Sequence, residues 1–215
     1  MTRMDFLLIA PELWVLTMTC VILCVDLFIK EERRGIIHLL AMATLIFAAI
    51  ITARVDYSMD HSATALAFND SFVRDQMGDM LKLFTYLVLA VVFVYAKTFL
   101  REFRMFRSDF YTFALEALLG IMLLISANNL IMIYLGLELL ALSSYSLVAL
   151  DRNSRRGAEA AMKYFVLGSM ASGMLLYGMS MIYGATGDLG LAEISAAVSE
   201  KGSDDILLVF GLVFL

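Results

Sequence analysis

Eight ionisable side chains lie inside stretches of the sequence that are otherwise apolar. They are Asp26, Asp79, Lys82, Asp109, Glu116, Glu138, Glu159 and Lys163. If these stretches cross a membrane, a charge near the bilayer centre costs at least about 2.5–3.5 kcal/mol, so such groups usually pair with one another or line an ion pathway. Carboxylates and lysines placed through a membrane can take up and release protons, which makes proton transfer the chemistry to consider.

Glu138 is the deepest of these groups. It lies in the apolar run 130–142, and a rise of about 1.5 Å per residue from Leu150 places it roughly 18 Å from that end of its helix. A carboxylate at this depth cannot reach water, so it must be protonated, paired or facing a hydrated cavity. It is either a protonated acid that bonds a neighbouring helix or a station on a proton path, and the pattern favours the second.

Lys163 is the predicted partner of Glu138, because it follows one helical hairpin later and consecutive helices are usually adjacent. It lies roughly 8 Å inside its helix. Glu159 precedes it by one turn, so a local Glu159–Lys163 pair near the interface is the alternative. Glu116 is either a third station on the proton path or a residue whose hydrogen bond helps to pack two helices together. A lysine that moves toward or away from Glu138 would change that glutamate's affinity for a proton.

The remaining ionisable groups are expected near helix ends. Asp26 lies one turn from the end of its helix, and Asp109 lies at a helix start, where a carboxylate suits the helix dipole. Asp79 and Lys82 fall in the first turn of one helix, so we expect them to pair with each other and to reach the headgroups. The secondary site candidates are Glu116, Glu159 and Asp109.

The composition requires a bilayer around these helices. Hydrophobic residues make up 61% of the 215 residues and charged residues 17%, against about 45–50% and 25% in soluble domains. Six segments qualify as spanning helices, which need about 20 apolar residues. They are residues 6–29, 36–53, 78–99, 110–126, 130–150 and 158–184. A seventh begins near Ile206 and stops at Leu215, so we expect the N-terminal part of a longer, all-α polytopic membrane protein.

Lysine and arginine alternate between the connections, as they should if successive segments cross a membrane. Three connections (30–34, 97–107 and 152–156) hold ten basic residues, whereas the N-terminus and the other connections hold four. Basic connections face the cytoplasm, so the N-terminus is expected outside. This topology accounts for the basic loops without a nucleic-acid partner.

Motifs for metal or nucleotide chemistry are missing from the sequence. It has no phosphate-binding glycine loop, no HExxH and no CxxC. Cys20 and Cys24 lie four residues apart in an apolar run, match no metal pattern and are expected to be packing residues.

Four motifs in the second half of the chain carry a family resemblance. They are LLISANNL at 123–130, LGLELLALSSY at 135–145, EAAMKYF at 159–165 and YGATGDL at 183–189. Together they resemble subunit N of NADH-quinone oxidoreductase, the respiratory complex I. The related L and M subunits usually have a tryptophan just before the glutamate, whereas Leu137 stands there in this chain, which favours subunit N.

The resemblance implies a fold of about fourteen helices with two inverted five-helix repeats, an arrangement typical of transporters. Residues 1–108 would then form three N-terminal transmembrane helices, and residues 109–215 would begin the first repeat. The family's fifth-helix glutamate falls on Glu138 and its sixth-helix lysine on Lys163, both with a role in proton translocation.

The resemblance also implies that this chain is a non-redox subunit of a proton-translocating NADH:quinone oxidoreductase. NADH, FMN, iron–sulfur clusters and quinone would belong to partner subunits. The neighbours in the membrane would be the antiporter-like M subunit and small subunits such as K and J. The expected location is the bacterial inner membrane rather than the mitochondrial one. A stand-alone cation/proton antiporter and a purely structural membrane subunit are the alternatives.

Overall fold

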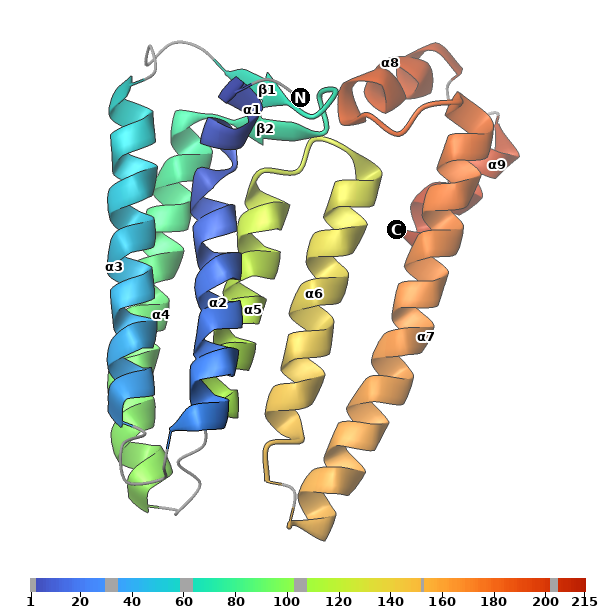
Figure 1. The fold of residues 1–215 in the computed structure, drawn as a ribbon. Helices are drawn as coiled ribbons and strands as arrows, with labels where there is room; N and C mark the ends of the chain where they lie inside the picture. The colour runs from blue at the N-terminus through green and yellow to red at the C-terminus, as the bar shows by residue number, and fades with distance from the viewer. Residues whose placement is uncertain (1–2, 30–34, 59–63, 103–107, 152, 202–204) are drawn as a thin grey trace.

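The computed structural model describes residues 3–29, 35–58, 64–102, 108–151, 153–201 and 205–215. It is a bundle of long helices with a small sheet and a short helix across one end (Figure 1). The elements in chain order are α1 (Arg3–Leu8), α2 (Ala10–Phe28), α3 (Gly35–Ser58), β1 (Ala65–Ala67), β2 (Phe72–Arg74), α4 (Gln76–Glu102), α5 (Asp109–Ile125), α6 (Leu130–Val148), α7 (Arg155–Thr186), α8 (Leu191–Lys201) and α9 (Ile206–Phe214). The predicted helical membrane architecture is confirmed.

Within the described residues, five helices are long and apolar enough to cross a membrane. They are α2, Gly35–Arg54 of α3, Gln76–Leu100 of α4, α6 and α7. Helix α5 lies among them with 17 residues, and α9 has 9. At about 1.5 Å per residue, α5 is slightly shorter than a hydrocarbon core of about 30 Å. The count of six complete spans and the start of a seventh therefore stays a prediction.

The first predicted segment, residues 6–29, is divided into two helices. The division falls at Ile9, which precedes α2 with φ −91° and ψ 7°, and Pro11 follows in the first turn of α2. Proline has no backbone N–H to donate, so it suits the start of a helix and not its interior. The break therefore has a local cause in the sequence, although the apolar pattern runs through it.

A two-stranded antiparallel sheet is the exception to the predicted all-α fold. Strands β1 and β2 pair from Ala65↔Arg74 to Ala67↔Phe72, and left-handed residues make the turn between them. These are Phe68, Asn69 and Asp70, with φ of 54°, 54° and 63°. The hairpin is fixed to the α5–α6 connection, because the Val73 amide donates to the Ser126 carbonyl at 2.9 Å. It therefore covers the ends of the helices beneath it.

Of the three groups of buried apolar side chains among the described residues, two hold the long helices together. The first lies among α2, α3, α4 and α5 and includes Ile22, Phe93 and Leu115. The second lies among α6, α7, α8 and α9 and includes Met179 and Leu208. Helix α6 contributes to both groups, with Leu139 packed on the first and Leu130 in the second. It is the element through which the two halves of the bundle meet.

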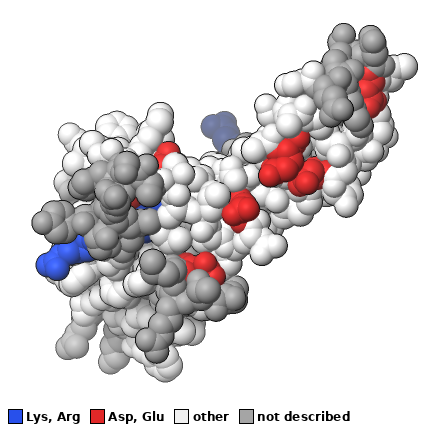
Figure 2. All heavy atoms as spheres, turned by 90° about the horizontal axis from the view of Figure 1, so that it is seen from above, with Lys and Arg blue, Asp and Glu red and all other residues white. Residues whose placement is uncertain are grey.

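The end of the bundle with the hairpin and α8 carries mostly acidic charge on its described surface (Figure 2). Its acidic residues include Asp70, Asp75, Asp188, Glu193 and Asp205. Helices α3, α5 and α7 begin at the opposite end (Figure 1), beside the three basic connections of the sequence. The described basic residues of these connections are Lys97, Arg101, Arg155 and Arg156, and which end of the bundle faces the cytoplasm stays a prediction.

Candidate functional site

Helix α6 carries Glu138 and is held closely against α5. At its start, the Asn129 side chain accepts a hydrogen bond from the Ile131 amide at 2.8 Å. Further along, Gly120 of α5 and Gly136 of α6 bring the two backbones together, since a Cβ on Gly120 would lie 2.8 Å from the Gly136 carbonyl oxygen. Small residues allow membrane helices to pack this closely. The place of Glu138, two residues after Gly136, is therefore fixed relative to α5.

Glu138 is half-buried, and two tyrosines of its own helix share its surroundings. Tyr134 lies one turn earlier and Tyr145 lies two turns later, and both interact electrostatically with the Glu138 carboxyl. Residues at these spacings lie on one face of a helix. The face of α6 that carries Glu138 therefore also carries two hydroxyl groups.

Tyr145 joins this face of α6 to α7. Its ring makes edge contacts with Tyr164, at 4.8 Å between ring centroids, and with Phe165, at 5.7 Å. A Cβ on Gly168 would overlap the Tyr145 hydroxyl, so the absence of a side chain there makes room for it. The sequence analysis missed Tyr145. The sequence indicates only that Tyr145 lies two helical turns after Glu138 and so on the same face of the helix. The contact with α7 cannot be predicted from this spacing.

Lys163 and Glu159 form an ion pair with each other. The Lys163 Nζ lies 2.6 Å from the Glu159 Oε1, and the two side chains are 70% and 62% exposed in this chain. The local pair is thus the observed geometry, and the ion pairs of the described residues do not include Glu138 with Lys163. Tyr145 contacts Tyr164, so the turn of α7 that carries Lys163 touches the face of α6 that carries Glu138.

Glu116 and Asp109 lie on α5 at different heights. Glu116 is half-buried and lies one turn before Gly120. Through the α5–α6 contact it comes within about one helical turn of Glu138 along the bundle axis. Asp109 is in the first turn of α5, roughly 10 Å further toward the basic end. The structure therefore places Glu116 at nearly the level of Glu138 and keeps Asp109 apart from it.

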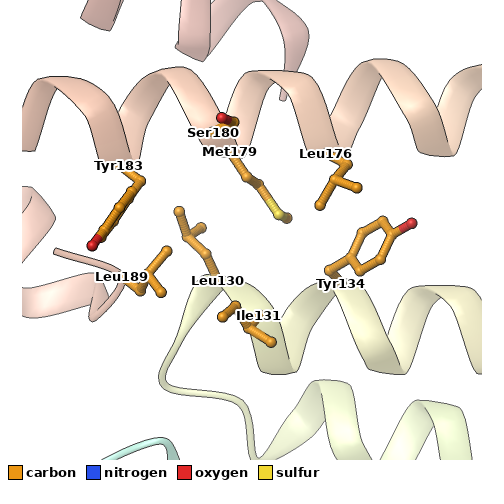
Figure 3. A pocket seen from close by; sticks show the side chains of 8 residues that line it. All are labelled: Leu130, Ile131, Tyr134, Leu176, Met179, Ser180, Tyr183 and Leu189. Atoms are coloured by element: carbon orange, nitrogen blue, oxygen red, sulfur yellow. The ribbon is translucent and has the colours of Figure 1, made fainter. Parts of the chain in front are cut away.

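Between α6 and α7, two cavities follow the Tyr145 contact toward the hairpin end. One, of about 550 Å³, is bordered by Leu137, Tyr145, Gly168 and Ser172 and by the last residues of α9. The other, of about 450 Å³, lies nearer the hairpin end, and Figure 3 shows the largely apolar side chains around it, Tyr134 among them. Each tyrosine beside Glu138 thus borders one of the cavities.

The prediction that Asp79 and Lys82 pair with each other and are exposed to the headgroups is wrong, because each pairs with another residue and both are buried. The Asp79 Oδ2 accepts a hydrogen bond from the Arg74 Nε at 3.0 Å, and the Lys82 Nζ lies 2.7 Å from the Glu12 Oε1. All four residues are at most 4% exposed. Arg74 of the hairpin pairs with Asp79, and Glu12 of α2 pairs with Lys82. Both partners lie outside the segment 78–99, so its sequence alone could not predict these pairs.

The described residues contain no cluster of three or more His, Cys, Asp and Glu side chains that could hold a metal ion. Cys20 and Cys24 are free and exposed on α2. The expected packing role of these cysteines is therefore not realised against other helices of this chain.

The chain is similar to known proteins over nearly its whole length. The family pattern described as "NADH:quinone oxidoreductase/Mrp antiporter, TM" matches residues 127–215. NADH-quinone oxidoreductase subunit N of Thiobacillus denitrificans is 47% identical over 100% of this chain and 44% of its own length. Subunit N of Thioalkalivibrio sulfidiphilus is 45% identical over 98% of this chain and 43% of its own length.

Solved structures share the fold. A chain of respiratory complex I from Thermus thermophilus superposes with a TM-score of 0.69 and 23% identity, over 94% of this chain and 43% of that one. A chain of the archaeal membrane-bound sulfane sulfur reductase gives a TM-score of 0.75 and 20% identity, over 99% and 43%. The present chain spans less than half the length of the curated relatives it matches. With this identity over nearly all of its residues, it belongs to the family of NADH-quinone oxidoreductase subunit N.

Proposed function

We propose that this chain is part of a membrane subunit that couples NADH:quinone electron transfer to proton translocation, and that it has no redox role of its own. The names of its relatives support the assignment, as does the antiporter-type family pattern over residues 127–215. Electron transfer then occurs in partner subunits that hold NADH, FMN, iron–sulfur clusters and quinone. The chain contributes ionisable groups within the membrane.

The observation that carries the proposal is the environment of Glu138. A half-buried carboxyl on an apolar helix faces two tyrosines, and these tyrosines border cavities between α6 and α7. A carboxyl in such a place can exchange a proton where it cannot reach bulk water. Glu138 is the proton-accepting group in this proposal.

In this proposal, Lys163 is the group that changes the proton affinity of Glu138. In the described geometry its ammonium pairs with Glu159 on its own helix, and a change of its side-chain conformation would bring the charge toward α6. A positive charge near Glu138 favours the ionised carboxylate, and its withdrawal favours the protonated acid. Movement of Lys163 between Glu159 and Glu138 would therefore load and release a proton. Glu116, at nearly the same level, is a secondary station, and Asp109 lies at the basic end of the path.

The proposal also covers the membrane spans of the chain, its orientation and its neighbouring subunits. Residues 1–108 form three N-terminal spans and residues 109–215 begin an antiporter-like repeat, with α5 as a sixth span and α9 as the start of a seventh. The N-terminus lies outside the bacterial inner membrane. The neighbours are the M subunit and the small K and J subunits. Positive-inside alternation in the sequence supports this orientation.

Substitution of Glu138 and Lys163 in the complete complex tests the function. We expect Glu138→Ala and Lys163→Ala to assemble but to lower proton pumping coupled to NADH oxidation several-fold, because the titratable pair is lost. Glu138→Asp should be milder, since a carboxyl remains. Proton uptake into inside-out vesicles, normalised to assembled complex on a native gel, measures the effect.

The control is Asp70→Asn, which removes an exposed carboxyl from the turn of the hairpin. Normal pumping by assembled Glu138 and Lys163 variants would assign these charges to helix packing, as in a purely structural subunit. Purification of the full-length protein without redox subunits, together with cation/proton exchange by the protein alone, would favour a stand-alone antiporter instead.

A further inference from the structure

Glu12 of α2 and Lys82 of α4 form a second carboxylate–ammonium pair, outside the site around Glu138. The Lys82 Nζ lies 2.7 Å from the Glu12 Oε1. Lys82 is 0% exposed and Glu12 is 2% exposed. The face of the Phe72 ring, from the hairpin, lies 5.3 Å from the ammonium. Unlike Lys163 and Glu159, these two charges come from different helices and are enclosed by this chain alone.

The pair leaves most of its hydrogen-bonding capacity unused. Apart from this 2.7 Å contact with each other, the Glu12 carboxyl oxygens and the Lys82 ammonium have no hydrogen-bond partner among the described residues. An ammonium has three donors and a carboxylate has about four acceptor sites. Buried polar groups without protein partners are usually satisfied by internal water. The unused donors and acceptors therefore indicate a ligand of water size and water chemistry.

A polar network leads from this pair toward the hairpin end. The Arg74 guanidinium donates to Asp79, to the Leu8 carbonyl at 2.9 Å and to the Thr52 carbonyl at 3.1 Å. The Thr52 hydroxyl lies 3.3 Å from the Tyr86 hydroxyl, and Tyr86 interacts electrostatically with Glu12, Asp79 and Arg74. Buried polar groups thus continue from Glu12 to the elements that cover the acidic end of the bundle.

Toward the basic end of the same helices, the buried side chains around α4 are mainly aromatic. There Phe93 is 0% exposed and packs against the rings of Phe110 and Tyr111, at 6.2 Å and 5.1 Å between centroids. The interior around α4 is therefore polar toward the hairpin end and largely aromatic toward the basic end. Among the described residues of this half of the bundle, the buried ion pairs and the hydrogen bonds of Arg74 lie toward the hairpin end of α4.

We propose that Glu12 and Lys82 form a second proton-exchanging site, which binds internal water and exchanges protons with the outer side of the membrane. In this site a proton from the outer side passes through the bound water to the Glu12 carboxylate, which leaves the water unchanged, and the neutral acid then releases Lys82 from the pair. Return of the proton to water restores the ion pair. The water site follows from the geometry alone, and its part in translocation rests on the proposed function.

The water site is tested in the intact wild-type complex by hydroxyl-radical labelling, with radicals generated from water by a synchrotron beam. Phe72 and Phe93 are both 0% exposed, but only Phe72 lies against the ion pair. We expect Phe72 to be labelled several-fold faster than Phe93, because radicals form from bound water beside it. Labelling of Phe72 no faster than Phe93 would overturn the water site.

The proton role is tested with the double variant Glu12→Gln/Lys82→Met. Removal of one partner would leave a buried unpaired charge, whereas replacement of both by neutral groups of similar size is often tolerated. We expect the double variant to assemble, to lose the fast labelling of Phe72 and to pump protons several-fold less per NADH oxidised. Normal pumping by the assembled variant, or failure to assemble, would make the pair structural and overturn its proton role.

A parallel measurement of Glu138→Ala separates the two proposals. Reduced pumping in Glu138→Ala with normal pumping in Glu12→Gln/Lys82→Met would contradict only the proton role of the second site. Normal pumping in both variants would contradict the proposed function as well. The labelling of Phe72 in the wild type decides the presence of water whichever of these results is obtained.

Discussion

Gly168 shows how one missing side chain places another residue. The Tyr145 hydroxyl occupies the space that a Cβ on Gly168 would fill, whereas a Cβ on Gly173 of the same helix would meet nothing within 4 Å. We predict that Gly168→Val destabilises the subunit by about 1–3 kcal/mol through overpacking. Gly173→Val is the matched control on α7. Thermal dissociation of the complex on native gels measures the difference.

The same substitution also tests the link between Tyr145 and proton transfer. Displacement of Tyr145 from α7 would separate the face with Glu138 from the turn with Lys163, so pumping by Gly168→Val should fall more than in Gly173→Val. Equal stability and equal pumping in the two variants would show that the α6–α7 contact does not depend on Tyr145.

Residue-level chemistry could be predicted from the sequence only where both partners lie close together in the chain. The Glu159–Lys163 pair has helical spacing, and the alternative based on that spacing describes the observed contact. Lys82 has a near neighbour of opposite charge, Asp79, yet it pairs with Glu12, 70 residues earlier. Periodicity shows that a charge lies in an apolar helix, but only the packing of helices selects its partner.

At the scale of elements, the hairpin depends on Arg74. This one side chain ties β2 to the Leu8 carbonyl, to the Thr52 carbonyl of α3 and to Asp79 of α4. We predict that Arg74→Met destabilises this end of the bundle by about 3–5 kcal/mol, because Asp79 would stay buried without its partner. Thermal dissociation of the complex is the measurement.

The matched control for Arg74→Met is Arg156→Met, which removes an exposed arginine from the first turn of α7 and should have little effect on thermal dissociation. A similar loss of stability in both variants would mean that total charge, and not the buried contacts of Arg74, determines the result.

Helices were easier to predict than the elements that connect them. Long apolar runs are sufficient to locate α3, α4, α6 and α7, whose residues overlap the predicted segments. The hairpin has only three residues in each strand, and α8 is an amphipathic helix of 11 residues, so neither produces a long pattern. The break before α2 had a visible cause in Pro11, but the apolar run outweighed it in the prediction.

At the scale of the whole molecule, the direction of insertion can be tested by cysteine labelling. Cys20 and Cys24 are first replaced by alanine, and Asp70→Cys or Asn153→Cys is then introduced at exposed positions at opposite ends of the bundle. We predict that a membrane-impermeant maleimide labels the cysteine at position 70 only in right-side-out vesicles and the cysteine at position 153 only in inside-out vesicles. The reverse pattern would invert the proposed topology.

The contact between Tyr145 and Gly168 has a mechanical consequence for α7. Toward the hairpin end from this contact, two cavities separate parts of α6 and α7, so the contact joins the two helices near the basic end of the bundle. Lys163 lies roughly 8 Å from Gly168 along α7, and Thr186 lies roughly 27 Å away in the other direction. A tilt of α7 about this point moves its far end three to four times as far as Lys163. Any tilt of α7 that moved Lys163 would therefore also disturb the packing of its far end on α8 and α9.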